Sequence, residues 1–203
     1  SPLDETMLMR KYFGHFINFM HSNYSRFEMC VGINVFSKDW NAMILDMLRV
    51  SPVGLAMDYS GHETNSTSQM FEAFGKVVEA YYDRGFSCAE DRMMRKRLLY
   101  CVCYHRTRVG SDVFLKNEHL MSGSAITAIM NSFVTMLHFR IAFLVLGRGT
   151  REGASLSDFT KLVCLKVYGD DNIASISARI PWFNSRSIAA CMQPFGIEMT
   201  MAD

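Results

Sequence analysis

Two runs rich in β-branched and aliphatic residues, 162–167 and 173–176, are separated only by Tyr168-Gly169-Asp170-Asp171-Asn172. Short runs of this kind around a glycine-containing turn predict a tight hairpin. The turn carries two neighbouring carboxylates, which repel each other unless a cation lies between them. Mg²⁺ prefers carboxylate oxygens and substrate phosphates. We therefore interpret Asp170 and Asp171 as candidate metal ligands, with a solvated turn as the alternative.

A third carboxylate, Asp58, follows the apolar run 54–57 within a predicted buried strand over 53–59. If this strand lies beside the hairpin, Asp58 and Asp170 can face each other across neighbouring strands. Two metal ions about 3.5–4 Å apart could then activate an attacking hydroxyl and stabilise a leaving phosphate. The alternative for Asp58 is a strand-end residue that caps the next turn.

The longest apolar-periodic stretch, Ser122 to Leu146, predicts one long helix. Ser122-Gly123 gives this helix a flexible start with free backbone amides. Thr127 and Asn131 are four residues apart, so they share a face. Polar groups in an apolar helix need partners, and a ribose hydroxyl is one candidate. Satisfied core polar residues are the alternative.

The remaining pattern predicts an α+β fold with an antiparallel sheet packed on helices. Helices are expected over 4–21, 38–49, 66–82, 88–99 and from 181 to about 196, and strands over 100–107, 113–116 and 197–199. The formal net charge of +1 is too small to indicate nucleic-acid binding by bulk electrostatics, so such binding must rest on a local site. The longest fully apolar run, 141–146, is too short to cross a bilayer, and no transmembrane segment is predicted.

Three surface features are candidates for contact with nucleic acid. Arg106 and Arg108 alternate on a predicted strand and could touch template phosphates, and Tyr168 flanks the two aspartates. The charged run 92–97 on a predicted helix is interpreted as a solvated face, with contact to an RNA backbone as the alternative.

Three motifs resemble, in order and in spacing, motifs A, B and C of viral RNA-dependent RNA polymerases. They are the runs 58–61 (D-Y-S-G), 122–131 (S-G-x-x-x-T-x-x-x-N) and 168–171 (Y-G-D-D). The run 195–200 is similar to the segment that closes motif D in picornavirus-like enzymes. The run 31–40 is similar to the fingers segment that precedes motif A in the same group, with insect picorna-like viruses as one candidate branch.

This resemblance implies a right-hand polymerase fold. Residues 1–52 would be a partial fingers segment, and 53–203 a palm subdomain with motifs A to D and a fingers insertion at about 66–100. The thumb would lie outside the chain, and we expect the isolated chain to be inactive. The implied reaction is attack of an RNA 3′-hydroxyl on the α-phosphate of a nucleoside triphosphate. Asp58 and Asp170 would hold two Mg²⁺ ions, or Mn²⁺, with Asp171 in support.

The resemblance also implies nucleotide contacts and partners. Ser122, Thr127 and Asn131 would contact the ribose, and Gly123 would act as a hinge. Glu63 stands where the family usually has an aspartate that takes part in ribose recognition. The implied partners are template and primer RNA, nucleoside triphosphates, the remaining fingers and thumb, and other viral replication proteins. The implied location is the host cytoplasm, in membrane-associated replication complexes.

Two other functions are compatible with parts of the pattern. A reverse transcriptase can also carry a Tyr-x-Asp-Asp hairpin, but Thr127 and Asn131 suit a substrate with a 2′-hydroxyl. A degenerate palm could act as a scaffold, but a scaffold has no need for the carboxylates of Asp58, Asp170 and Asp171.

Overall fold

The computed structural model describes residues 3–85, 88–116, 123–150 and 155–201. Its centre is a four-stranded sheet in the order β4-β5-β1-β6, in which every neighbouring pair is antiparallel. The strands are β1 (Gly54–Tyr59), β4 (Val163–Tyr168), β5 (Asp171–Ile176) and β6 (Met199–Met201). The predicted α+β fold is confirmed.

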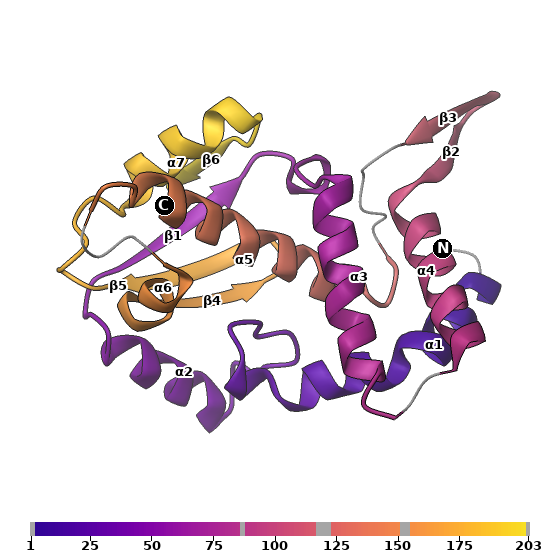
Figure 1. The fold of residues 1–203 in the computed structure, drawn as a ribbon, viewed down its shortest axis with the longest axis horizontal. Coiled ribbons are helices and arrows are strands. Elements are labelled where there is room, and N and C mark those ends of the chain that lie inside the picture. Colours follow the sequence, from indigo (N-terminus) through magenta and orange to yellow (C-terminus); the bar gives the residue numbers. More distant parts are fainter. Residues whose placement is uncertain (1–2, 86–87, 117–122, 151–154, 202–203) are drawn as a thin grey trace.

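Helices cover both faces of this sheet. The long helix α5 (Thr127–Leu146) packs on β4 and on α7 (Ser185–Met192), and Figure 1 shows it running across the sheet. In β4 the side chains of Val163, Leu165 and Val167 are buried, as expected for the inner face of a strand. The helix α2 (Lys38–Leu48) contacts β4 and β5 where Lys166 lines a small cavity with Met43.

Three further helices form a group beside the sheet (Figure 1). They are α1 (Leu3–Ser22), α3 (Ser68–Tyr82) and α4 (Ala89–Cys103). A two-stranded hairpin of β2 (His105–Val109) and β3 (Asp112–Lys116) extends from the end of α4. One hydrophobic core joins α1, α3 and α4 to α5 and the sheet, because buried residues from all of them pack together.

The helix α5 is buried around much of its circumference. It is long and apolar enough to cross a membrane by length and composition alone, and half of its most apolar window is buried inside the fold. Its buried residues include Met130, Val134 and Phe139, and Met130 and Phe139 pack in the core that the helix shares with the sheet. A core helix has the same composition as a membrane span when protein surrounds it on several sides.

Several predicted boundaries are wrong. The strand expected from Tyr100 begins at His105, because α4 continues to Cys103. Its buried residues Leu98, Leu99, Val102 and Cys103 follow helical spacing, and this burial outweighs the strand preference of the local sequence. The helix expected from Pro181 begins at Ser185, where Asn184 and Ser187 form a capping box.

The region before the β4–β5 hairpin also differs from the prediction. The long helix begins at Thr127, and residues 123–126 contain turns. A short helix that was not predicted, α6 (Leu156–Leu162), precedes β4 directly. The Ser155 hydroxyl accepts a hydrogen bond from the Asp158 N–H and caps this helix, a local signal that the sequence contained.

Candidate active site

The predicted hairpin is present, and its turn is as tight as a hairpin permits. Strands β4 and β5 pair in register from Val163↔Ile176 to Tyr168↔Asp171. Only Gly169 and Asp170 lie between the last paired residues, and Gly169 has a φ of +67°. Two-residue hairpin loops require such left-handed backbone, which glycine adopts without strain. Asp170 is therefore at the tip, and Asp171 begins β5.

Strand β1 lies beside this hairpin, as the two-metal interpretation requires. It pairs with β5 at Gly54↔Ser175, Leu55↔Ala174 and Ala56↔Ile173. This pairing ends at Ala56↔Ile173, so Asp58 lies two residues beyond it on β1, and Asp171 lies two residues before Ile173 at the start of β5. All three carboxylates are exposed.

The donor set of this site consists of hard oxygen ligands. Exposed aspartates on a strand and an adjoining turn suit Mg²⁺, which keeps several waters and shares its coordination with substrate phosphates. Within the described ranges, however, no group of three or more His, Cys, Asp or Glu side chains is already gathered to hold a metal ion. The three aspartates fit the chemistry of the metal, and its coordination would still have to be completed by substrate or water.

Asn172 joins β1 to β5 at the point where their regular pairing ends. The Met57 N–H donates to Asn172 Oδ1 at 3.1 Å, and Asn172 Nδ2 donates to the Met57 carbonyl at 2.8 Å. A side-chain amide thus makes the two hydrogen bonds that two backbone peptide groups would make in a regular ladder. The same Nδ2 lies 2.7 Å from the Asp170 carbonyl oxygen. This residue was not singled out from the sequence, where an asparagine beside a turn is common.

Two buried hydroxyls of α5 form hydrogen bonds with the backbone of the turn. Gly169 N–H donates to Ser132 Oγ at 2.8 Å, and Thr135 Oγ1 donates to the Gly169 carbonyl at 2.8 Å. Thr135 Oγ1 also lies 2.9 Å from Nε2 of His62, which begins the short 3-10 turn His62–Thr64. Sequence reasoning missed Ser132 and Thr135, although both are polar residues within an apolar helix.

Two histidines lie buried beside this hydroxyl pair. His138 Nδ1 is 3.3 Å from the Tyr59 hydroxyl, and burial lowers the pKa of His138 to about 4. Burial also lowers the pKa of His62, against a raising influence from Asp170. The pKa of Tyr59 is raised by burial. All three rings are therefore uncharged at neutral pH, which suits a buried polar cluster.

The candidate ribose-binding residues lie at the start of α5, close to the turn. Thr127 opens this helix and Asn131 follows one turn later, directly before Ser132, which bonds to Gly169. The Oδ1 atom of Asn131 is buried and has no hydrogen-bond partner among the described residues. Such an atom is a candidate contact for a ligand. Gly123 is exposed with a φ of +92°, and Ser122 lies outside the described residues.

Glu63 is exposed on the 62–64 turn, next to His62, which reaches the Gly169 turn through Thr135. The candidate RNA contacts are less closely grouped. Tyr168 is exposed and pairs with Asp171 beside the turn. Arg106 and Arg108 are exposed on the β2–β3 hairpin, which lies beyond α3 from the sheet in Figure 1. The structure therefore does not bring these two arginines together with the carboxylates.

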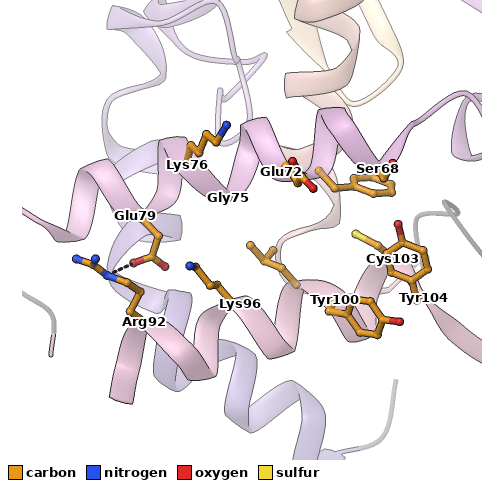
Figure 2. Close-up of a pocket in the computed structure, with 12 residues that line it drawn as sticks. Ser68, Glu72, Gly75, Lys76, Glu79, Arg92, Lys96, Tyr100, Cys103 and Tyr104 are labelled. Atoms are coloured by element: carbon orange, nitrogen blue, oxygen red, sulfur yellow. Dashed lines mark ion pairs between the residues drawn. The ribbon is translucent and has the colours of Figure 1, made fainter. Parts of the chain in front are cut away.

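A cavity of about 540 Å³ lies elsewhere, in a groove between α3 and α4 (Figure 2). Glu79 reaches from α3 toward Arg92, and their charged atoms are 3.6 Å apart. The lining contains none of the predicted metal ligands or nucleotide contacts, but it includes Arg92 and Lys96 of the charged run 92–97. Arg95, on the same helix as Arg92, is buried and bonds to Glu79. The interpretation of 92–97 as a wholly solvated face is therefore wrong at Arg95.

The fold is that of a viral polymerase. A Sicinivirus 3Dpol RNA-dependent RNA polymerase superposes on it with a TM-score of 0.76 and 20% identity, over 96% of this chain and 38% of that chain. A family model described as viral RNA-dependent RNA polymerase matches residues 1–203. The chain belongs to the viral RNA-dependent RNA polymerase family, and the resemblance drawn from the sequence is confirmed. The family match does not favour the reverse transcriptase alternative.

Viral polyproteins from insect and plant hosts are among the relatives. The chain is 28% identical to a replicase polyprotein of Acute bee paralysis virus over 98% of its length, and 30% identical to a genome polyprotein of Rice tungro spherical virus (strain Vt6) over all of it. It spans 11% and 6% of these polyproteins, respectively. The two identities are so similar that they do not separate an insect branch from a plant branch.

Proposed function

We propose that this chain provides the palm and catalytic centre for RNA-templated RNA synthesis in viral replication. Residues 53–203 would form the palm and 1–52 part of the fingers, with the thumb in another part of the polymerase. The observation that supports the proposal is that β1, which carries Asp58, pairs with β5, which begins at Asp171, in a chain that belongs to this polymerase family.

In this proposal Asp58 and Asp170 hold the two divalent ions and Asp171 supports them. Bound Mg²⁺, or Mn²⁺, supplies charge stabilisation at the attacking hydroxyl and at the leaving pyrophosphate. The polypeptide contributes the positions of the ligands. The β4–β5 register sets the positions of Asp170 and Asp171, and the hydrogen bonds of Asn172 to Met57 hold β1 beside β5 next to Asp58. Exposure of the carboxylates leaves them open to the triphosphate.

The start of α5 and the 62–64 turn would recognise the nucleotide. Asn131 has a buried oxygen without a partner in the described ranges, and a ribose hydroxyl can donate to it. Ser122 and Thr127 would contribute further contacts, with Gly123 as a hinge. Glu63 would accept a hydrogen bond from the sugar on the other side.

The partners in this proposal are template and primer RNA, nucleoside triphosphates, the remaining fingers and thumb, and other viral replication proteins. Tyr168 would contact RNA beside the turn, and Arg106 and Arg108 would contact RNA phosphates along the β2–β3 hairpin. The site of action would be the host cytoplasm, in membrane-associated replication complexes.

The test is Asp170→Ala in a polymerase that contains this chain, with Asp4→Ala as the control at an exposed aspartate in the first turn of α1. We expect Asp170→Ala to lower RNA synthesis about 1000-fold or more, because metal stabilisation of the transition state amounts to several kcal/mol. Asp4→Ala should retain activity. Persistent synthesis by Asp170→Ala would contradict the metal-site assignment. Primer extension with deoxyribonucleotides as fast as with ribonucleotides would favour a reverse transcriptase.

A further inference from the structure

The turn that carries Asp170 is anchored on both sides of Gly169. The Gly169 N–H belongs to the Tyr168–Gly169 peptide plane and donates to Ser132 Oγ at 2.8 Å. The Gly169 carbonyl belongs to the Gly169–Asp170 plane and accepts from Thr135 Oγ1 at 2.8 Å. Peptide planes are rigid, so the two bonds together restrain the φ and ψ of Gly169. Glycine would otherwise be the most mobile residue of the turn.

The direction of each hydrogen bond is determined by its surroundings. The Ser132 hydroxyl donates to the Ala128 carbonyl at 2.8 Å, so its lone pair is available for the Gly169 N–H. The Thr135 hydroxyl has one hydrogen and uses it on the Gly169 carbonyl. It then accepts from His62 Nε2, 2.9 Å away, in the tautomer that carries its proton on Nε2. The result is a series of hydrogen bonds that runs from His62 through Thr135 to the backbone of the turn.

This series of hydrogen bonds connects three parts of the sequence to which the proposed function assigns different roles. His62 precedes Glu63, the proposed sugar contact, within the 62–64 turn. Ser132 and Thr135 lie one turn apart on α5 and follow Asn131. Gly169 precedes Asp170. His62, Ser132 and Thr135 are all buried, at 3%, 0% and 0% exposure, so water competes little for these bonds.

We propose that Ser132, Thr135 and His62 are positioning residues that set the place of Asp170 and couple it to the sugar-recognition turn. The inference rests on the proposed function, because it assigns these residues a role in the same reaction. All three side chains are buried, so none of them is assigned a contact with the substrate. Their effect is on the orientation of the peptide that leads into Asp170, and hence on the metal ion that Asp170 would hold.

The central experiment compares three threonine variants in a polymerase that contains this chain. Thr135→Val removes the hydroxyl at nearly constant volume, and Thr135→Ser restores it. Thr150→Val is the matched control, because the Thr150 hydroxyl also donates to a glycine carbonyl, that of Gly147 at 2.8 Å, beyond the other end of α5. The measurements are kcat, KM for the nucleoside triphosphate, the Mg²⁺ concentration for half-maximal rate, and Tm.

We expect Thr135→Val to lower kcat about 10–100-fold and to raise the Mg²⁺ requirement, as is typical when the support of a metal ligand is removed. KM for the nucleotide should change little. Thr135→Ser should recover most of the rate, and Thr150→Val should resemble wild type. A merely structural role would lower Tm without changing the Mg²⁺ requirement.

The link to His62 is tested by combining His62→Phe with Thr135→Val. If both act through one chain, their effects on kcat overlap, and the double variant is about as slow as the slower single variant. Additive effects would overturn the link to His62. Should Thr135→Val fail to fold, Ser132→Ala replaces it as the smaller truncation, with the same expected loss of kcat and rise in Mg²⁺ requirement.

The outcomes separate this inference from the function on which it rests. If Asp170→Ala abolishes synthesis while Thr135→Val keeps the wild-type kcat and Mg²⁺ requirement, the positioning role is overturned and the polymerase assignment stands. The positioning role is also overturned if Thr135→Ser is as slow as Thr135→Val, since the hydroxyl would then be irrelevant. If Asp170→Ala retains synthesis, both proposals are overturned.

Discussion

Asn172 holds Met57 by both of its backbone polar groups, with bonds of 3.1 Å and 2.8 Å to the two ends of one side-chain amide. These bonds join the strand that carries Asp58 to the strand that begins at Asp171. Met57 directly precedes Asp58, and Asn172 directly follows Asp171. A backbone ladder would make the same connection with two peptide groups. At Met57 a single side chain makes it, so a single substitution can remove it there, while the backbone pairing from Gly54 to Ala56 remains.

We predict that Asn172→Leu destabilises the protein by about 2 kcal/mol or more, because the Met57 N–H and carbonyl lose their partner. RNA synthesis should fall about 10–100-fold, since Asp58 and Asp171 lose their common support. Urea unfolding and a primer-extension assay measure the two effects. Asn23→Leu is the control, since the Asn23 side chain donates to the Phe19 carbonyl near the end of α1, away from the carboxylates. A wild-type rate in Asn172→Leu would contradict the prediction.

A second prediction concerns the buried ion pair between α3 and α4. Arg95 is 1% exposed, donates to both carboxylate oxygens of Glu79 at 2.8 and 2.7 Å, and lies 4.0 Å from the centre of the Tyr82 ring. Arg95→Ala leaves the Glu79 charge in a largely buried site with the more distant Arg92. We expect a loss of about 3–5 kcal/mol in the free energy of unfolding.

The control for this prediction is Arg49→Ala. Arg49 pairs with Asp46 at 2.8 Å, but its side chain is 79% exposed. Exposed pairs contribute about 1 kcal/mol or less, so this variant should unfold almost as wild type does. Equal losses in the two variants, measured by urea unfolding, would show that burial does not decide the contribution of Arg95.

The contrast between Arg95 and the β4–β5 hairpin shows what the sequence could reveal. The hairpin is local: its strands, its glycine and its aspartates are adjacent in the chain, so pattern alone placed them. Arg95 lies in a charged run, and its burial depends on Glu79, sixteen residues away on another helix. Thr135 and Asn172 are likewise ordinary polar residues until Gly169 and Met57 are brought to them by the fold.

The end of α4 shows a different limit. The residues from Tyr100 to Tyr104 favour a strand by composition. In the helix that they form instead, Leu99, Val102 and Cys103 share one face and are buried in the core. Packing against α1 and α3 then extends the helix to Cys103. A preference measured over five residues is too weak to oppose burial of this extent.

A third prediction follows from the lowered pKa of His138. The buried ring has a pKa of about 4, below the ordinary value of 6.5, because burial disfavours its charged form. The unfolded chain therefore takes up a proton as the pH falls below 6.5, while the folded protein does so only near pH 4. Stability should be fully present above pH 6.5 and should decline between pH 6.5 and 4, by up to about 3 kcal/mol.

Measurement of Tm from pH 7 to pH 4 checks this prediction. His138→Gln should flatten the decline, because the amide does not titrate in this range. His21→Gln, at an exposed position, should leave the pH dependence as it is in wild type. Identical pH profiles for wild type and His138→Gln would contradict a role for His138.

The last prediction concerns sugar selection by Glu63. Its carboxylate is exposed on the 62–64 turn, and the chain from His62 to Gly169 ties that turn to the proposed metal site. In Glu63→Gln the proposed hydrogen bond to a ribose hydroxyl would lose its charge, and the preference for ribonucleotides over deoxyribonucleotides should fall about 10-fold. Glu63→Asp keeps the charge and should keep most of the preference. Glu72→Gln, at an exposed glutamate on α3, is the control.

Because only the ribonucleotide has a 2′-hydroxyl to bind, the change should appear in the ribonucleotide's kcat/KM. An equal loss for both sugars would instead indicate that Glu63 acts on the metal site.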